Sequence, residues 1–104
     1  MSEVKALLRI DYMIGYGASS TSEEEKKEIE KANSEIVNYF LSNKVILPIT
    51  PSIGMSIDFE EFVENVSEKE ISKDSKEMLV GSGEQYLKIT DIIICNGYLD
   101  LRFD

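Results

Sequence analysis

The sequence predicts an α+β domain in which one long helix packs on a four- or five-stranded, mostly antiparallel sheet that ends in a C-terminal β-hairpin. A single amphipathic segment runs from Ser22 with no Gly or Pro before Pro48, which is typical of a long helix. The other apolar runs are short and rich in β-branched residues, and the last two surround Asn96-Gly97. A length of 104 residues suits one domain spanning residues 1–104.

The first strand is expected within residues 4–14, which are dominated by Val, Leu, Ile, Tyr and Met and end at Gly15-Tyr16-Gly17. The long helix is expected to begin at Ser22, which forms a capping box with Glu25. Its apolar stripe has helical spacing and points to one side of the helix. The residues of this stripe are Ile29, Ala32, Ile36, Val37 and Phe40.

Asn43 is expected to end this helix in a left-handed conformation. Residues 45–49 predict an edge strand or a strand with a break on its solvent side, because Pro48 cannot donate to a sheet hydrogen bond. A short strand over residues 55–59 is expected to lead into a short helix capped by Asp58. Residues 64–85 are polar and leave two alternatives open, a mobile excursion or a short helix whose Met78-Leu79 edge docks on the core.

The hairpin covers residues 86–104, and Asn96-Gly97 predicts a type I′ turn with positive φ at both residues. A two-residue loop sets the register. The expected cross-strand pairs are Ile94 with Leu99, Ile92 with Leu101, Thr90 with Phe103 and Asp91 with Arg102. One face of the hairpin is then almost entirely apolar and has to be covered.

The chain is acidic, with 20 Asp and Glu against 11 Lys and Arg and a net charge of −9. Such a field repels nucleic-acid phosphates and anionic lipid, and it favours a basic protein partner. We therefore expect no direct nucleic-acid binding. We also expect no membrane association, because no segment has the length of a membrane span or the pattern of a signal peptide. Cys95 is the sole cysteine, which suits a reducing compartment and predicts a cytoplasmic protein.

Histidine is absent, which excludes Ser-His and Cys-His pairs and an imidazole base. Gly15-Tyr16-Gly17 lacks the third glycine of a dinucleotide-binding loop, and three glutamates follow it where a pyrophosphate would lie. Cys95 has no nearby cation in the sequence and is interpreted as a packing residue. The sequence thus predicts no catalytic residue, no cofactor and no enzyme.

Carboxylates and tyrosines are the remaining candidates for a binding site. Asp58, Glu60 and Glu64 could share Mg²⁺ or Ca²⁺, but their spacing does not match an EF-hand calcium loop. Two other interpretations are that these carboxylates are simply solvated, or that they form a docking site for a basic groove on a partner. Tyrosine is amphipathic and common at interfaces. The predicted partner-binding residues are Asp58, Glu60, Glu61, Glu64, Tyr16, Tyr98 and Asp100.

These observations favour a small acidic non-enzymatic binding protein that docks on a basic surface of a partner protein, as an inhibitor, an immunity protein or a nucleic-acid mimic does. The alternative is a small-ligand-binding or assembly module that forms a homo-oligomer through its sheet. The run Ile92-Ile93-Ile94 is apolar on both faces, which allows a homodimer to form at a sheet edge.

Overall fold

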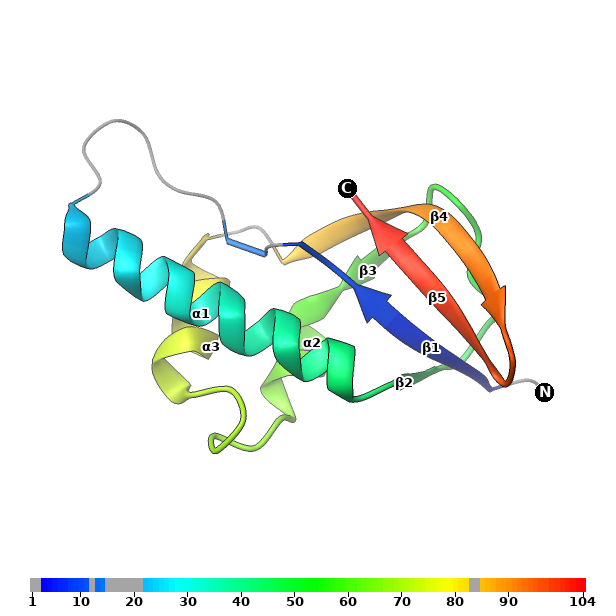
Figure 1. Ribbon diagram of the computed structural model, residues 1–104, viewed down its shortest axis with the longest axis horizontal. Helices are drawn as coiled ribbons and strands as arrows, with labels where there is room; N and C mark the ends of the chain where they lie inside the picture. Colours follow the sequence, from blue (N-terminus) through cyan, green and yellow to red (C-terminus); the bar gives the residue numbers. More distant parts are fainter. Residues whose placement is uncertain (1–2, 12, 15–21, 83–84) are drawn as a thin grey trace.

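The C-terminal hairpin lies inside the sheet, with earlier strands of the chain on both sides of it. The computed structural model describes residues 3–11, 13–14, 22–82 and 85–104. Its strands form one five-stranded sheet in the order β2-β1-β5-β4-β3 (Figure 1). In chain order the elements are β1 (Val4–Arg9), α1 (Glu23–Ser42), β2 (Val45–Leu47), β3 (Ser56–Asp58), α2 (Phe59–Glu64), α3 (Lys73–Ser82), β4 (Tyr86–Cys95) and β5 (Tyr98–Phe103).

The sheet is mixed and confirms the predicted α+β class. β1 pairs with β5 in parallel, whereas the β1–β2, β3–β4 and β4–β5 pairs are antiparallel. β2 lies at one edge, as Pro48 predicts, and β3 lies at the other. β1 ends at Arg9, so the predicted strand over residues 4–14 is too long, and Gly15-Tyr16-Gly17 lies outside the described residues.

α1 begins and buries its apolar stripe as predicted. The Ser22 Oγ accepts a hydrogen bond from the Glu25 N–H at 3.2 Å. Ile29, Ala32, Ile36 and Phe40 are buried and Val37 is partly buried. The prediction for Asn43 is wrong, because its φ of −132° is extended and not left-handed. The Asn43 N–H and the Asn43 Nδ2 both donate to the Tyr39 carbonyl, each at 2.9 Å, and this satisfies the helix end without a left-handed residue.

Ser22→Ala is expected to lower the free energy of unfolding by about 1 kcal/mol, because it removes an acceptor for the free N–H groups of the first turn of α1. Urea denaturation followed by circular dichroism measures this change. Ser42→Ala, at the other end of the same helix, is the matched control and should change the stability by less than about 0.5 kcal/mol. Equal effects of the two substitutions would contradict the capping role.

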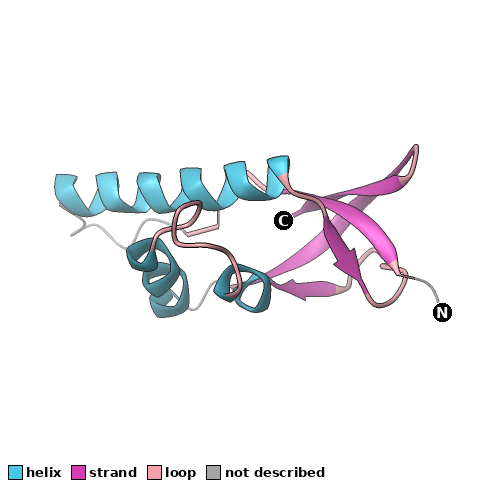
Figure 2. Ribbon diagram, turned by 90° about the horizontal axis from the view of Figure 1, so that it is seen from below, coloured by secondary structure: helices cyan, strands magenta, loops and turns pink. Residues whose placement is uncertain are grey.

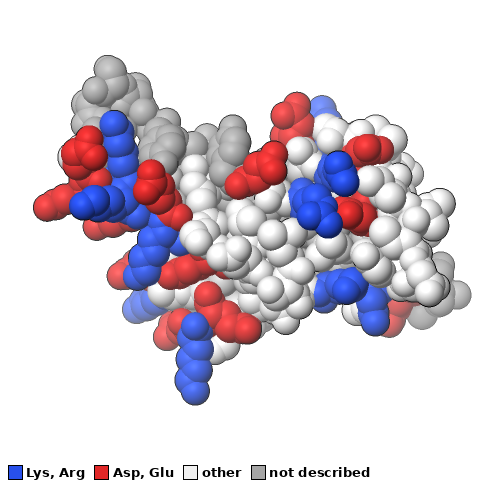
Figure 3. All heavy atoms as spheres, in the orientation of Figure 1, with Lys and Arg blue, Asp and Glu red and all other residues white. Residues whose placement is uncertain are grey.

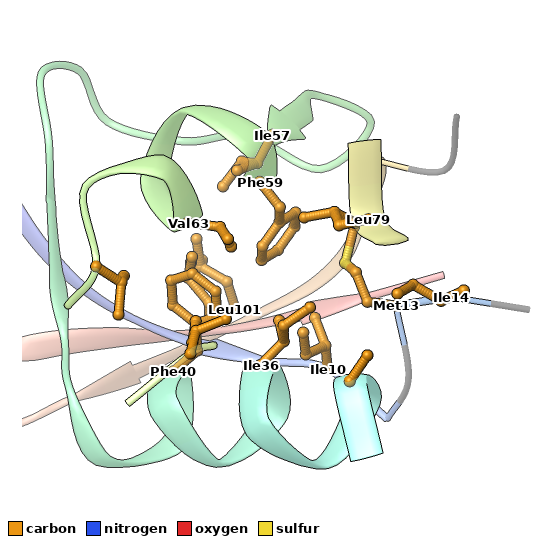
Figure 4. Close-up of a cluster of buried hydrophobic side chains, with 14 of the residues drawn as sticks. Ile10, Met13, Ile14, Ile36, Phe40, Ile57, Phe59, Val63, Leu79 and Leu101 are labelled. Atoms are coloured by element: carbon orange, nitrogen blue, oxygen red, sulfur yellow. The ribbon is translucent and has the colours of Figure 1, made fainter. Parts of the chain in front are cut away.

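The core lies between α1, the shorter helices and the sheet. Figure 2 shows α1 along one side of the molecule, α2 and α3 opposite it, and the strands at one end. In Figure 4 the side chains of Phe40 and Ile36 from α1 point toward Phe59 and Val63 from α2. Phe40 and Phe59 meet edge to face, with ring centroids 5.5 Å apart. Leu79 of α3 is fully buried, which confirms the short-helix alternative for residues 64–85.

The hairpin register is confirmed near the turn and wrong at Thr90. Ile94 pairs with Leu99, Ile92 with Leu101 and Asp91 with Arg102. Phe103 pairs with Ile89 and not with Thr90, because an irregularity between Ile89 and Asp91 inserts Thr90 as an extra residue in β4. An extra residue restores the side chain of Ile89 to the core face, where it is buried.

The turn of the hairpin differs from the predicted type I′. Gly97 has a φ of +88°, but among the described residues no residue other than glycine has a positive φ, so Asn96 does not. One positive φ at the second central position is the pattern of a type II turn. The two-residue loop itself is confirmed, since Cys95 pairs with Tyr98.

The apolar face of the hairpin is only partly covered, contrary to the prediction. Leu101 and Ile89 are buried under the helices, but Ile94, on the same face near the turn, is 84% exposed. Ile94 is exposed because the hairpin extends beyond the end of α1, so the helix does not cover the residues next to the turn (Figure 1). An apolar side chain is thus left in solvent at the tip.

Candidate functional site

The excess negative charge lies on the helical part of the chain. Residues 22–42 contain six acidic and three basic residues, and residues 58–82 contain eight acidic and three basic ones. The described residues of the sheet and its connections, 3–11, 13–14, 43–57 and 85–104, contain five of each sign. The molecule is 46 Å long, and on the face in Figure 3 the charged side chains crowd its helical end while most of the sheet end is uncharged. The acidic field is therefore concentrated at one end.

α2 and the residue that caps it hold four of the predicted partner-binding residues. Asp58 begins it, and its Oδ1 accepts a hydrogen bond from the Glu60 N–H at 3.0 Å, as the predicted cap requires. Phe59 and Val63 anchor the helix in the core, which turns Glu61 and Glu64 toward solvent. Among the described residues, none of the three glutamates of α2 forms an ion pair. Their charge is available to a partner.

An apolar groove lies between α2 and α3, with a volume of about 410 Å³. Val63, Leu79 and the half-exposed Val80 supply apolar surface. The lining is completed by Glu60, Glu64, Lys76, Glu77 and Gly81. The Lys76 Nζ donates a hydrogen bond to the Val66 carbonyl, so this ammonium is held by the backbone and forms no ion pair with the glutamates.

A second apolar groove lies on the other side of α2, between this helix and the connection from β2 to β3, with a volume of about 280 Å³. Asp58 and Glu61 lie among its lining residues. Exposed apolar side chains of the connection, Ile49 and Met55, also line it. α2 is thus an acidic ridge with an apolar groove on each side, and we call this surface, Asp58 to Glu64 with its two grooves, the α2 ridge.

Asp100 and Tyr98 lie in the hairpin, away from the α2 ridge. Asp100 is only 6% exposed, and both its oxygens accept hydrogen bonds from the Arg9 Nε at 3.2 Å. The same bonds, followed by the charge of Asp100, raise the pKa of Arg9. Because this carboxylate is paired inside the sheet, it contributes little to an external acidic surface.

Tyr98 follows the hairpin turn and is half-buried. The Lys44 Nζ lies 4.5 Å from the centre of its ring, a cation–π contact. A hydrogen bond with the Cys95 side chain raises the pKa of the Tyr98 phenol. Tyr16 lies outside the described residues.

No metal centre or membrane-spanning helix is present in the described ranges. No three Asp, Glu or Cys side chains there come together in a way that could hold a metal ion, including Asp58, Glu60 and Glu64. No helix of residues 22–82 is both long enough and apolar enough to cross a bilayer.

A partly buried polar cluster that sequence reasoning missed fixes α3 against α1 and so shapes the groove between α2 and α3. The Glu35 Oε1 accepts hydrogen bonds from the Ser72 N–H at 2.9 Å and from the Ser75 Oγ at 2.7 Å. These serines begin α3, where the free N–H groups favour a negative charge. The only hint of this cluster in the sequence is that Glu35 lies beside the apolar stripe of α1. Its hydrogen-bond partners are 37 and 40 residues away, so local patterns do not reveal them.

Glu35 makes the free energy of unfolding depend on pH in the acidic range. Burial raises its pKa, but the hydrogen bonds from Ser72 and Ser75 and the charge of Lys31 outweigh burial, so the pKa is lowered from its ordinary value of 4.5. A lowered pKa in the folded state means that the contribution of Glu35 is fully present above pH 4.5 and is lost as the pH falls through the lower folded value.

Glu35→Gln is therefore expected to destabilise the protein at neutral pH and to have a smaller effect in acid. Unfolding free energies of both proteins, measured by urea denaturation from neutral pH to below the ordinary Glu pKa, give this difference. Glu28→Gln, an exposed position on the same helix, is the control and should give a difference that changes little with pH. A Glu35→Gln effect that grows as the pH falls would contradict the assigned sign.

The structure therefore brings together four of the seven predicted residues, Asp58, Glu60, Glu61 and Glu64, and separates Tyr98 and Asp100 from them. The two grooves and the Glu35 cluster were not predicted. Comparison of the chain with protein-family models, curated proteins and solved structures gave no match.

Proposed function

We propose that this protein is a small acidic non-enzymatic binding protein that docks on a basic surface of a partner protein, in the manner of an inhibitor, an immunity protein or a nucleic-acid mimic. The observation that supports this most is the α2 ridge, in which unpaired glutamates stand between two apolar grooves. Cys95, the single cysteine, suits action in the cytoplasm.

The two parts of the α2 ridge act at different stages of binding. Concentrated charge attracts a cationic surface over several ångströms and raises the association rate. Apolar surface such as Val80 and Met55 excludes water after contact and slows dissociation. A partner that fits both has apolar side chains flanked by Lys or Arg.

The proposal predicts salt-sensitive binding to a synthetic amphipathic helix with leucines on one face and lysines on the other. Isothermal titration calorimetry at low and high salt measures its affinity for the protein and for the triple variant Glu60→Gln, Glu61→Gln, Glu64→Gln. Three charges at about 0.5 kcal/mol each predict an affinity about tenfold weaker for the variant, with a smaller salt dependence.

The matched control is Glu23→Gln, Glu24→Gln, Glu25→Gln, which removes the same charge from the first turn of α1. It should weaken binding far less than the α2 variant. Equal losses for the two variants would mean that only net charge matters and would contradict docking at the α2 ridge. Absence of any salt-sensitive binding would contradict the proposed function.

A second candidate function is the binding of a small apolar ligand in the groove beside β3, which Pro48, Ile49 and Met55 help to line. A neutral apolar dye such as Nile red is then expected to fluoresce on binding and to raise the melting temperature of the protein. Ile49→Lys should abolish both effects, whereas Ile53→Lys, at an exposed position outside the groove lining, should leave them unchanged.

A further inference from the structure

The last half of β4 is a sheet edge that no strand of the described residues covers. β3 pairs with Tyr86, Leu87 and Lys88 only. The Gly54 N–H and the Met55 carbonyl extend this pairing to Ile89, and it stops there. From Asp91 to Cys95, β4 therefore has β5 on one side and no strand of the described residues on the other.

The backbone groups on this edge follow from the hairpin register. Cys95 and Tyr98 flank the two-residue loop and form a hydrogen-bonded pair, and such pairs alternate along an antiparallel ladder. The N–H and C=O groups of Ile92 and Ile94 therefore point away from β5. The Ile92 N–H donates a hydrogen bond to the Asp91 Oδ1 at 3.0 Å. The N–H and C=O groups of Ile94 have no hydrogen-bond partner among the described residues.

The side chains of this edge are apolar. Ile94 is 84% exposed and Ile93, on the opposite face, is 37% exposed. Natural sheet edges are usually protected by lysine, proline or a covering segment. Between Asp91 and Cys95 this edge has no lysine or proline. An exposed edge of this composition favours pairing with another strand.

We propose that this edge, Asp91 to Cys95, pairs antiparallel with the same edge of a second copy of the chain. With the two-fold axis at Ile93, Ile93 faces Ile93 of the partner subunit, Ile92 faces Ile94 and Asp91 faces Cys95. Apolar side chains then meet apolar side chains, and no like charges are opposed. In this register the outward N–H and C=O groups of Ile94 gain backbone partners, and a backbone carbonyl of the second copy replaces the Asp91 Oδ1 as the acceptor for the Ile92 N–H.

The distribution of charge favours a second copy as the occupant. A net charge of −9 would oppose self-association if it were uniform, but the described residues of the sheet and its connections contain equal numbers of acidic and basic residues. β4 runs from the helical end toward the hairpin turn, so antiparallel pairing directs the two acidic ends away from each other (Figure 1). The proposal does not depend on the docking function of the α2 ridge.

The first test is the mass of the protein in solution. Sedimentation equilibrium should give a dimer of the 11.8 kDa chain at high micromolar concentration, at both low and high salt. Ile94→Lys places a charge on both sides of the interface and should weaken the dimer by about 100-fold or more, since each substitution counts twice. Ile53→Lys, at a 65% exposed position in the connection from β2 to β3, is the control and should remain dimeric.

The second test reads the register directly and does not depend on Ile94. In the background Cys95→Ser, Ile93→Cys should form a disulfide-linked dimer under mild oxidation, because directly opposed residues of an antiparallel pair bring their Cβ atoms within about 5.5 Å. The native Cys95 faces Asp91 of the partner subunit in this register, so the unsubstituted protein should link much more slowly.

Three results would overturn the proposal. The first is a monomer at all concentrations and salt conditions, which would leave the edge for a strand of a different protein. The second is equal weakening by Ile94→Lys and Ile53→Lys, which would indicate non-specific apolar association. The third is faster disulfide formation through Cys95 than through Ile93→Cys, which would contradict the register.

Discussion

Phe40→Ala is expected to lower the free energy of unfolding by about 3–5 kcal/mol, the largest effect of any substitution considered for this chain. Phe40 has no exposed surface. Its ring meets those of Tyr39, Phe59 and Phe62 edge to face, at centroid distances of 5.2, 5.5 and 6.4 Å. Removing it leaves a cavity where α1 contacts α2, and the rings around that cavity lose their contacts.

Urea denaturation measures this effect, and Leu41→Ala is the matched control. Leu41 is the next residue of α1 and is 40% exposed, so its truncation should cost less than about 1 kcal/mol. A loss of stability for Phe40→Ala no greater than that for Leu41→Ala would show that α1 and α2 do not pack through this ring. Phe40→Leu, which fills part of the space, should fall between the two.

Asn33→Ala is expected to destabilise the protein by on the order of 3 kcal/mol, although asparagine is polar and only partly buried. The Asn33 Oδ1 accepts hydrogen bonds from the N–H groups of Met13 and Ile14, both at 2.7 Å. Its Nδ2 donates to the Ile14 carbonyl at 2.8 Å. Alanine would leave these backbone groups unpaired in the core, since Met13 and Ile14 are almost fully buried.

Asn38→Ala tests whether the effect belongs to this site. Asn38 is exposed on the same helix, and its Nδ2 donates to the exposed Ser34 hydroxyl, so its removal should change the stability by less than about 0.5 kcal/mol. Amide hydrogen exchange gives a second readout, because the Met13 and Ile14 N–H groups should lose protection in Asn33→Ala and keep it in Asn38→Ala. Unchanged protection in both variants would contradict the role of Asn33.

Local signals in the sequence predicted most of the fold. The cap at Ser22, the apolar stripe of α1 and the two-residue loop at Asn96-Gly97 each act within a few residues, and all three are present in the structure. The extra residue Thr90 was not predicted. The position of the register shift in β4 depends on which of its side chains packs in the core, and this packing involves elements that are distant in the sequence.

The candidate site was predicted in part for the same reason. The acidic residues of the α2 ridge lie within seven positions of the sequence, and a short helix keeps them together. Asp100 was grouped with them because the sequence alone does not show that Arg9, 91 residues away, lies beside it in the sheet. The grooves beside α2 depend on α3 and on the connection from β2 to β3, so neither could be read from the residues of α2.

The separation of charge along the molecule gives it a large electric dipole. In the field of a cationic surface such a molecule experiences a torque as well as an attraction, so it rotates its helical end forward before any atoms touch. Orientation then precedes contact, which reduces the number of unproductive collisions that a freely tumbling body would make. Two chains paired antiparallel along β4 about a two-fold axis would cancel most of this dipole while presenting an acidic end at each extremity.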